Sequence, residues 1–302
     1  MILIGENIHI ISKKVREALE NKNENFVKNL IKIQQNLDTI DLNIGPARGK
    51  LDNIFEWLIP MCEGKNISFD STNFEAIIHA LSIVKNPAEC FINSTSKESE
   101  KLAALTDAAA KYNCNLIALA LDECGIPKSA DNRLEIIFEI YEKCMEKGLS
   151  SEKLFFDPLI LPIKADQSQA IEALSTIRMI KESFEPKVKT IIGLSNISNG
   201  IPTQYRSIVN RTFGVLAYGA GLDAAIIDAK DEELIRIFKM LEENSPQSQI
   251  DKLYLNLSEM IKSFGELEDI KFDKNDPQQQ NIIKTAAVLL NREVYSDSFA
   301  QV

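Results

Sequence analysis

The chain has 302 residues, of which 34 are Lys or Arg and 44 are Asp or Glu, so its formal net charge is −10. A hydrophobic fraction of 45% and a charged fraction of 26% are typical of a globular protein and exclude a disordered or disulfide-stapled chain. The acidic balance argues against a nucleic-acid binder, which needs a basic face. No apolar run approaches the ~20 residues that span a membrane.

The cysteines indicate a reducing compartment. There are five of them, so they cannot all pair, and they are scattered without a Cys-x-x-Cys pair (Cys62, Cys90, Cys114, Cys124 and Cys144). The N-terminal segment MILIGENIHI lacks the basic start and small-residue cleavage site of a secretory signal. We therefore interpret the cysteines as reduced thiols of a cytoplasmic protein.

Short apolar runs alternate along the chain with segments of helical periodicity. The eight runs are Ile2–Ile4, Thr39–Asn43, Ile67–Asp70, Cys90–Asn93, Leu116–Leu121, Leu154–Asp157, Thr190–Leu194 and Ala224–Asp228. They are short and apolar without strict alternation, as expected of buried parallel strands. Between them, segments such as Val15–Asn36 and Arg133–Lys147 place apolar side chains at helical spacing. The repeated strand–helix pattern predicts an α/β fold, the (β/α)8 TIM barrel. A doubly wound open sheet is the alternative, although no GxGxxG motif follows the first run.

The pattern changes after the eighth run. Ala229–Glu242 has helical periodicity, whereas 243–280 is polar and contains an amphipathic patch at Leu253–Phe264. An apolar helix is predicted again at Asn281–Asn291. We interpret 243–280 as a small polar, partly helical insertion before the last helix of a single domain that spans 1–302.

Acidic and amide side chains follow nearly every predicted strand. They include Asn7, Asp41, Asn43, Asp70, Asn93, Asp122, Asp157, Asn196 and Asp228. Any one of them is explained by capping of the following helix. In a barrel, however, all strand ends meet at one mouth, where the active sites of this fold lie. So many carboxylates and carboxamides in these positions favour a binding site.

Groups that commonly act as catalytic bases or metal ligands are scarce. His79 falls in the helical stretch Phe74–Val84, where a structural or exposed role is favoured, and His9 alone makes no metal site. No HExxH, GxSxG or Walker A motif occurs. Cys124 follows the fifth predicted strand, but without an adjacent His a reactive thiol is disfavoured. We therefore predict that the chain binds no metal.

Asp and Asn side chains around an apolar floor suit a flat, neutral heterocycle with several donors and acceptors. A carboxylate accepts two parallel N–H bonds from a 2-amino-4-oxo ring edge. An Asn both donates and accepts, so it can follow a ring nitrogen whose protonation changes. Such a pocket selects by hydrogen-bond matching, because an unpaired buried carboxylate is costly.

Eight segments carry a resemblance to a known family. They are Asp41-Leu42-Asn43-Ile44-Gly45-Pro46, Phe69-Asp70-Ser71-Thr72-Asn73, Ile92-Asn93-Ser94-Thr95, Phe156-Asp157-Pro158-Leu159-Ile160-Leu161-Pro162, Gly193-Leu194-Ser195-Asn196-Ile197-Ser198, Asn210-Arg211-Thr212-Phe213, Gly221-Leu222-Asp223-Ala224-Ala225 and Tyr295-Ser296-Asp297-Ser298-Phe299. Together they resemble the methyltetrahydrofolate:corrinoid protein methyltransferases of the pterin-binding TIM-barrel superfamily, which also contains dihydropteroate synthase and the folate module of cobalamin methionine synthase.

The resemblance implies a site at the strand ends. Asp70, Asn93 and Asp157 match the residues that hold the pterin ring, and Gly193 and Ser195 flank it. Asn196 matches the Asn whose amide reaches N5, the nitrogen that carries the methyl group, and is the implied catalytic residue. Further contacts are implied for Asn7, Asp41, Asn43, Arg206 and Asp228, with Arg206 on the aminobenzoyl-glutamate side.

The implied reaction moves the N5 methyl group of methyltetrahydrofolate to Co(I) of a corrinoid. Because a tertiary amine is a poor leaving group, N5 must first gain positive character by protonation or hydrogen bonding. The cobalamin or other corrinoid is carried by a partner protein, with or without an iron–sulfur centre. The resemblance also implies a homodimer.

Three alternatives remain open. Dihydropteroate synthase has related strand ends but adds Lys and Arg near the last strands, and here the seventh strand ends in Gly193-Leu194-Ser195-Asn196 without a basic residue. A non-catalytic folate-binding barrel would keep the pocket without turnover. An unrelated barrel enzyme is the third, because fold alone does not fix function.

Overall fold

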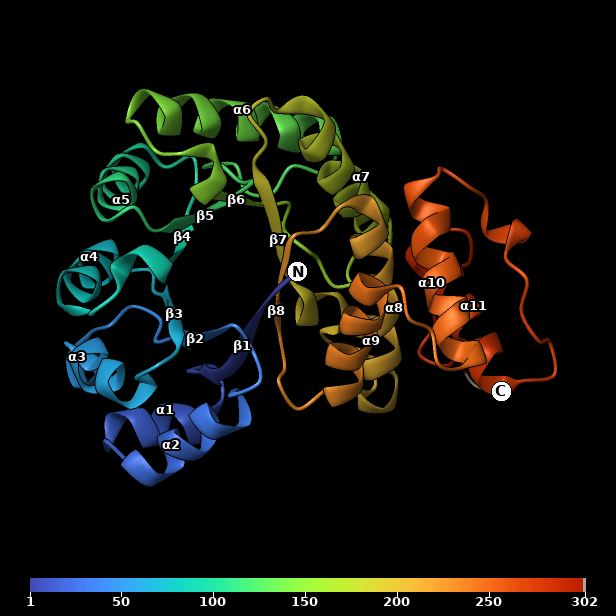
Figure 1. The fold of residues 1–302 in the computed structure, drawn as a ribbon, viewed down its shortest axis with the longest axis horizontal. Helices are drawn as coiled ribbons and strands as arrows, with labels where there is room; N and C mark the ends of the chain where they lie inside the picture. The colour runs from blue at the N-terminus through green and yellow to red at the C-terminus, as the bar shows by residue number, and fades with distance from the viewer. Residues whose placement is uncertain (301–302) are drawn as a thin grey trace.

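The computed structural model describes residues 1–300 and contains a closed barrel of parallel strands (Figure 1). The strands are β1 Ile2–His9, β2 Thr39–Asn43, β3 Asn66–Asp70, β4 Phe91–Thr95, β5 Asn115–Leu119, β6 Leu154–Asp157, β7 Lys189–Gly193 and β8 Ala224–Ile227. Each strand pairs with the next in chain order, and β8 pairs with β1. This closed order confirms the predicted (β/α)8 barrel and excludes the doubly wound open sheet.

Helices surround the barrel on its outside (Figure 1). They are α1 Lys13–Glu20, α2 Glu24–Ile33, α3 Ile54–Leu58, α4 Phe74–Ile83, α5 Ser99–Tyr112, α6 Ala130–Glu146, α7 Ser168–Ser183, α8 Thr203–Ala220, α9 Glu232–Glu243, α10 Gln249–Lys262 and α11 Pro277–Leu289. Within residues 1–300, none of these helices combines the length and the apolar character needed to cross a membrane.

The segment Val15–Asn36, which has helical periodicity in the sequence, belongs to two helices in the structure, α1 and α2. Lys22 between them has a φ of 49°, in the left-handed region that ends a helix. Asn23 then begins α2, since its side chain accepts a hydrogen bond from Phe26 N at 3.2 Å. Asn at such a position satisfies one of the free N–H groups of the first turn.

Side chains alternate between the barrel interior and the layer beneath the helices. The interior apolar cluster takes one buried residue from each of six strands: Ile4, Phe91, Ile117, Phe155, Ile191 and Ala224. Their chain neighbours, such as Ile92 and Phe156, belong instead to the layer that packs against the helices. A residue two positions after an interior residue on a regular strand faces inward again, nearer the C-terminal mouth.

Strand β1 extends further than the predicted Ile2–Ile4. Its pairing with β2 shifts register between Gly5 and Ile8, and this irregularity lets the strand continue to His9. Asn7 and His9 therefore lie within β1 rather than after it. Strands β2 and β6 have the predicted bounds, and the remaining strands differ from theirs by one or two residues.

The segment predicted as an insertion forms α10 and the turns that lead to α11, and both helices pack on the outer side of α8 (Figure 1). Helix α10 begins with a reciprocal capping box, in which Ser248 and Asp251 satisfy each other's backbone N–H groups. Helix α11 begins at Pro277, whose missing N–H costs nothing there, after the capping Asp276. The division of the chain into one domain with an insertion stays a prediction.

We expect Gly219→Ala to destabilise the contact between α8 and α10. A Cβ at Gly219 would lie 2.3 Å from the carbonyl oxygen of Ser258, which belongs to the α10 backbone. The two helices must move apart, at a cost of ~1–3 kcal/mol in the free energy of unfolding. Urea denaturation followed by circular dichroism measures this loss.

The matched control is Gly265→Ala. A Cβ there would meet its nearest neighbour, Met260 Cγ, at 3.4 Å, which is ordinary contact. We expect a change within about 0.5 kcal/mol for this variant. Equal stability of the Gly219→Ala variant and the wild type would contradict the close approach of α8 and α10.

Candidate active site

The strand alternation directs a set of polar side chains into the C-terminal end of the barrel. Asn93 lies two positions after Phe91, and Asp157 lies two positions after Phe155, so both face the interior. Asn93 is 8% exposed and Asp157 is also 8% exposed. Carboxylates and carboxamides are seldom buried unless they are hydrogen-bonded or functional.

Hydrogen bonds link the polar side chains at the ends of three neighbouring strands. Asn43 Nδ2 donates to Asp70 Oδ2 at 2.5 Å, and Asn93 Nδ2 donates to Asp41 Oδ1 at 3.1 Å. The strand register pairs Asn43 with Asp70 and Asp70 with Asn93, so the ends of β2, β3 and β4 lie side by side. The structure thus brings together four residues that the sequence singled out.

Burial raises the pKa of both carboxyls in this group. The pKa of Asp70 rises to about 7, because desolvation outweighs the hydrogen bond from Asn43 and the positive charge of Lys101. The pKa of Asp41 rises well above its ordinary value, first by burial and then by the neighbouring charge of Asp70. Burial and the like charge of the partner therefore both favour the protonated form of Asp41.

Asp157 ends β6 on the other side of the barrel. Its Oδ1 accepts a hydrogen bond from Leu159 N at 2.7 Å. Burial raises its pKa to about 7, against the opposing effects of that hydrogen bond and of the Arg133 charge. Near neutral pH, Asp157 changes easily between an acceptor-only carboxylate and a carboxylic acid that also donates.

Glu6 is a site residue that the sequence reasoning missed. Ser195 Oγ donates to Glu6 Oε1 at 2.5 Å, which links β1 to the turn after β7. Burial raises the pKa of Glu6 to about 7, helped by the charges of Asp228 and Asp41 and opposed by the Ser195 hydrogen bond. The available signal was the position of Glu6 two residues after the end of the first apolar run.

Asn7 and Asp228 form a clamp between the ends of β1 and β8. Asn7 Nδ2 donates to Asp228 Oδ1 at 2.6 Å, and Asn7 Oδ1 accepts from Ala229 N at 3.0 Å. Both the nitrogen and the oxygen of the Asn7 side-chain amide therefore have a hydrogen-bond partner. The charge of Asp228 contributes to the raised pKa of Glu6, which places this clamp beside Glu6.

Asn196 is exposed on the short 3-10 turn Leu194–Ser198 that follows β7. Its Oδ1 accepts a long hydrogen bond of 3.3 Å from Asn199 Nδ2. A Cβ at Gly193 would lie 3.0 Å from Asn196 Nδ2, so the glycine lets the amide lie close over the strand end. Arg206, near the start of α8, is exposed, and its Nε donates to Ile201 O at 3.2 Å.

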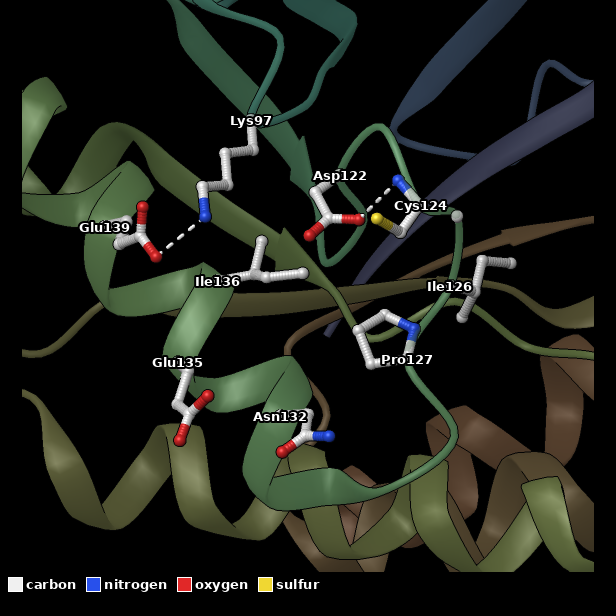
Figure 2. A pocket seen from close by; sticks show the side chains of 10 residues that line it. Lys97, Asp122, Cys124, Ile126, Pro127, Asn132, Glu135, Ile136 and Glu139 are labelled. Atoms are coloured by element: carbon white, nitrogen blue, oxygen red, sulfur yellow. Dashed lines mark hydrogen bonds and ion pairs between the residues drawn. The ribbon is translucent and has the colours of Figure 1, made fainter.

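A cavity of about 340 Å³ lies between the segments that follow β4 and β5 and helix α6, and Figure 2 shows the side chains that line it. Lys97 Nζ pairs with Glu139 Oε1 at 2.7 Å across it, and Asp122 Oδ1 accepts from Cys124 N at 2.8 Å. The predicted pterin-binding residues are not among its lining residues. Cys124 is exposed, whereas the other four thiols are buried.

The two histidines lie in different environments. His79 is exposed on α4 and pairs with Glu56 Oε1 at 2.7 Å, in keeping with the structural or exposed role predicted for it. His9, at the end of β1, accepts from Ile11 N through Nδ1 at 3.1 Å. Burial lowers the pKa of His9, which favours its neutral form.

The sequence of this chain matches a known family over most of its length. Residues 14–228 match the family described as pterin binding enzyme, and the chain belongs to this family. It is 24% identical over 242 residues to the methylcorrinoid:tetrahydrofolate methyltransferase of Eubacterium limosum, a match that covers 78% of this chain and 88% of that protein. It is 27% identical over 175 residues to the methionine synthase of Mycobacterium leprae, covering 55% of this chain and 14% of that longer protein.

Solved structures share the fold. The dihydropteroate synthase of Coxiella burnetii in complex with pteroic acid superimposes with a TM-score of 0.54 at 12% identity, over 74% of this chain and 86% of that chain. The dihydropteroate synthase of Yersinia pestis gives a TM-score of 0.50 at 13% identity, over 80% of this chain and 94% of that chain. At such low identity, the likeness shows the fold alone.

The raised carboxyl pKa values make the stability of the protein depend on pH. Folded Glu6 keeps its proton up to about pH 7, whereas the unfolded chain loses it near the ordinary value of 4.5. Between these two values the folded state binds more protons, so the free energy of unfolding falls as pH rises. Asp70 and Asp157 act in the same direction, because their pKa values rise from 3.8 to about 7.

We expect Glu6→Gln to reduce this slope by about 1.4 kcal/mol per pH unit. Urea denaturation at about pH 5, 6 and 7 measures it. Glu63, which is exposed, provides the control, since Glu63→Gln should keep the wild-type slope. A Glu6→Gln variant with the wild-type slope would show that Glu6 loses its proton at its ordinary pKa in the folded protein.

Proposed function

We propose that this protein is a methyltransferase that moves the N5 methyl group of methyltetrahydrofolate to Co(I) of a corrinoid protein. The observation that carries the proposal is the set of buried carboxyls and amides at the strand ends, with Asp70, Asn93 and Asp157 facing inward. Membership of the pterin-binding family and the similarity to the Eubacterium limosum methyltransferase support it. The name of that relative describes methyl transfer from a methylcorrinoid to tetrahydrofolate, and one site can serve both directions of the reaction.

The ring edge of a pterin matches these side chains chemically. Its 2-amino group and the adjacent ring N–H form two parallel donors, which a carboxylate such as Asp157 accepts in a bidentate manner. Asn93 uses its amide N–H on Asp41, which leaves its Oδ1 as an acceptor for the ring. Asp70 is held in place by Asn43 and provides a further acceptor. A flat heterocycle is thereby selected by hydrogen bonding rather than by charge.

Asn196 acts on the leaving group. Its amide accepts from protonated N5 or donates to neutral N5 after reorientation, so it stabilises positive character at this nitrogen in the transition state. Exposure of Asn196 on the 3-10 turn and its single long hydrogen bond to Asn199 leave the amide free to turn. Ser195, the adjacent residue, holds Glu6, which keeps a proton close to neutral pH.

The acceptor comes from a second protein. The corrinoid bound to that partner supplies a Co(I) nucleophile, and this chain orients the folate and excludes competing groups. The partner docks over the barrel mouth, where Gly193, Ser195 and Arg206 form part of the surface around Asn196. We further propose that the protein is a homodimer located in the cytoplasm. We also propose that it holds no metal of its own and binds neither nucleic acid nor a membrane.

The experiment that tests the function is methyl transfer from methyltetrahydrofolate to reduced free cobalamin, followed by the change in the cobalt absorption spectrum. We expect formation of methylcobalamin and release of tetrahydrofolate. Binding of methyltetrahydrofolate without transfer would favour a non-catalytic folate-binding barrel. Formation of dihydropteroate from a pterin pyrophosphate and p-aminobenzoate would favour the dihydropteroate synthase alternative.

We expect Asn196→Ala to lower the transfer rate ~100- to 1000-fold, because it removes a hydrogen bond that strengthens in the transition state. The thermal midpoint should stay close to that of the wild type, since the side chain is exposed. Stopped-flow absorption of the cobalamin measures the rate. The control is Asn199→Ala, which removes the neighbouring exposed amide and should retain most activity. Wild-type rates in the Asn196→Ala variant would remove Asn196 from the mechanism.

A further inference from the structure

Residues 294–300, which follow α11 and which we call the C-terminal strap, are attached to the loop between β6 and α7. Gln167, the last residue of that loop, accepts through Oε1 from Tyr295 N at 2.6 Å. Its Nε2 donates to Val288 O at 3.0 Å and to Glu293 O at 2.5 Å. These bonds join residues between 121 and 128 positions apart, so one glutamine fixes the base of the strap to the distant loop.

Two side chains of the strap make further contacts. Both carboxylate oxygens of Asp297 accept from Lys164 Nζ, at 3.0 and 2.9 Å, and Tyr295 Oη donates to Asp297 Oδ1 at 2.6 Å. The ring of Phe299 lies 5.8 Å from that of Tyr205, in the first turn of α8. The strap therefore contacts both the loop before α7 and the start of α8.

These contacts reach the segment between β7 and α8, which carries Asn196. Ile163, the neighbour of Lys164, donates through its backbone N to Ile197 O at 3.1 Å. The stem of Lys164 lies beside the same segment, because a Cβ at Gly200 would be 3.7 Å from Lys164 Cδ. An ordered strap thus restrains the backbone that runs from Asn196 to α8.

The strap contacts act locally. The Lys164 and Asp297 side chains are 44% and 55% exposed, and an ion pair with this exposure adds little to the free energy of unfolding. The end of a chain is poorly ordered unless contacts tie it down, and ordering it costs conformational entropy. Lys164, Gln167 and Tyr205 all lie between the C-terminal end of a strand and the first turn of the next helix, which is the rim of the barrel mouth. The contacts therefore restrain this rim more than they stabilise the whole fold.

We propose that the C-terminal strap is a positioning element for Asn196: through Lys164 and Tyr205 it holds the backbone that presents the Asn196 amide at the mouth. The amide itself is held only loosely, by the 3.3 Å hydrogen bond from Asn199, so its placement depends on this backbone. A displacement of ~1 Å at a reacting centre can cost ~100-fold in rate. The effect on methyl transfer rests on the proposed function, whereas the restraint of the segment exists in the protein without ligand.

Hydrogen exchange of the unliganded protein, measured by mass spectrometry of peptides covering 158–167 and 194–202, tests the restraint. We expect Asp297→Asn to speed exchange in both peptides about two- to fivefold, the range that the loss of an exposed ion pair supports. The matched control is Asp107→Asn, which breaks a pair with Lys147 whose side chains are 58% and 44% exposed, and it should leave both peptides unchanged. Unchanged exchange in Asp297→Asn would overturn the proposal.

A double-mutant cycle shows whether the restraint acts through the ion pair. Lys164→Met removes the charge and keeps an aliphatic stem beside Gly200. We expect this variant to match Asp297→Asn in exchange, and the double variant to exchange no faster than either, because all three lack the same pair. Effects that multiply in the double variant would show that the two residues act separately, which would contradict a restraint through their pair.

The rate of methyl transfer from methyltetrahydrofolate to reduced free cobalamin separates positioning from general loosening. The variant with both Asp297→Asn and Phe299→Ala loses both strap contacts. We expect its kcat to fall at least about tenfold. Its KM for methyltetrahydrofolate should stay within about twofold of the wild type, because the proposed ring contacts lie on other strands.

An Asn196→Ala background identifies the residue through which the strap acts. There the same two substitutions should have no further effect on kcat, since the amide that the strap positions is already absent. An equal loss in that background, or an unchanged kcat in the wild-type background, would overturn the role of the strap in placing Asn196. Absence of transfer by the wild type would contradict the proposed function, while hydrogen exchange still decides the restraint.

Discussion

Carboxyl groups held out of water at the mouth of a closed barrel determine most of the chemistry available to this protein. Closure of β1 to β8 forces the inward-facing strand ends to converge, so Asp41, Asp70 and Asp157 share the barrel interior. Burial there raises their pKa values, and hydrogen bonds from Asn43 and Leu159 offset part of the cost. These groups form a surface that recognises a ligand by its hydrogen-bond donors and acceptors more than by its charge. Such a surface suits a neutral bicyclic ring better than an anion.

The rest of the fold keeps these groups in place. Apolar residues on the outer face of the strands pack against the helices in two large clusters, one around β2 to β6 and the other around β7, β8 and the C-terminal helices. The Asn7–Asp228 clamp links the ends of β1 and β8. Rigid placement of this kind allows a hydrogen bond to be stronger in the transition state than in the ground state, because little reorganisation is needed.

The barrel could be predicted from the sequence because apolar side chains recur at different spacings in strands and in helices. A closed parallel barrel repeats this alternation of strand and helix eight times. It also predicted that Asn43, Asp70 and Asn93 would meet, since strand ends converge in this fold. The Glu6–Ser195 pair was missed because it depends on contacts between residues 189 positions apart.

A crystal structure of the protein with methyltetrahydrofolate bound tests the central claim most directly. The account predicts that the bicyclic ring lies within hydrogen-bond distance of Asp70, Asn93 and Asp157, with N5 facing the amide of Asn196. A ligand seated elsewhere, for example in the cavity beside Lys97 and Cys124 (Figure 2), with those three side chains untouched, would contradict it.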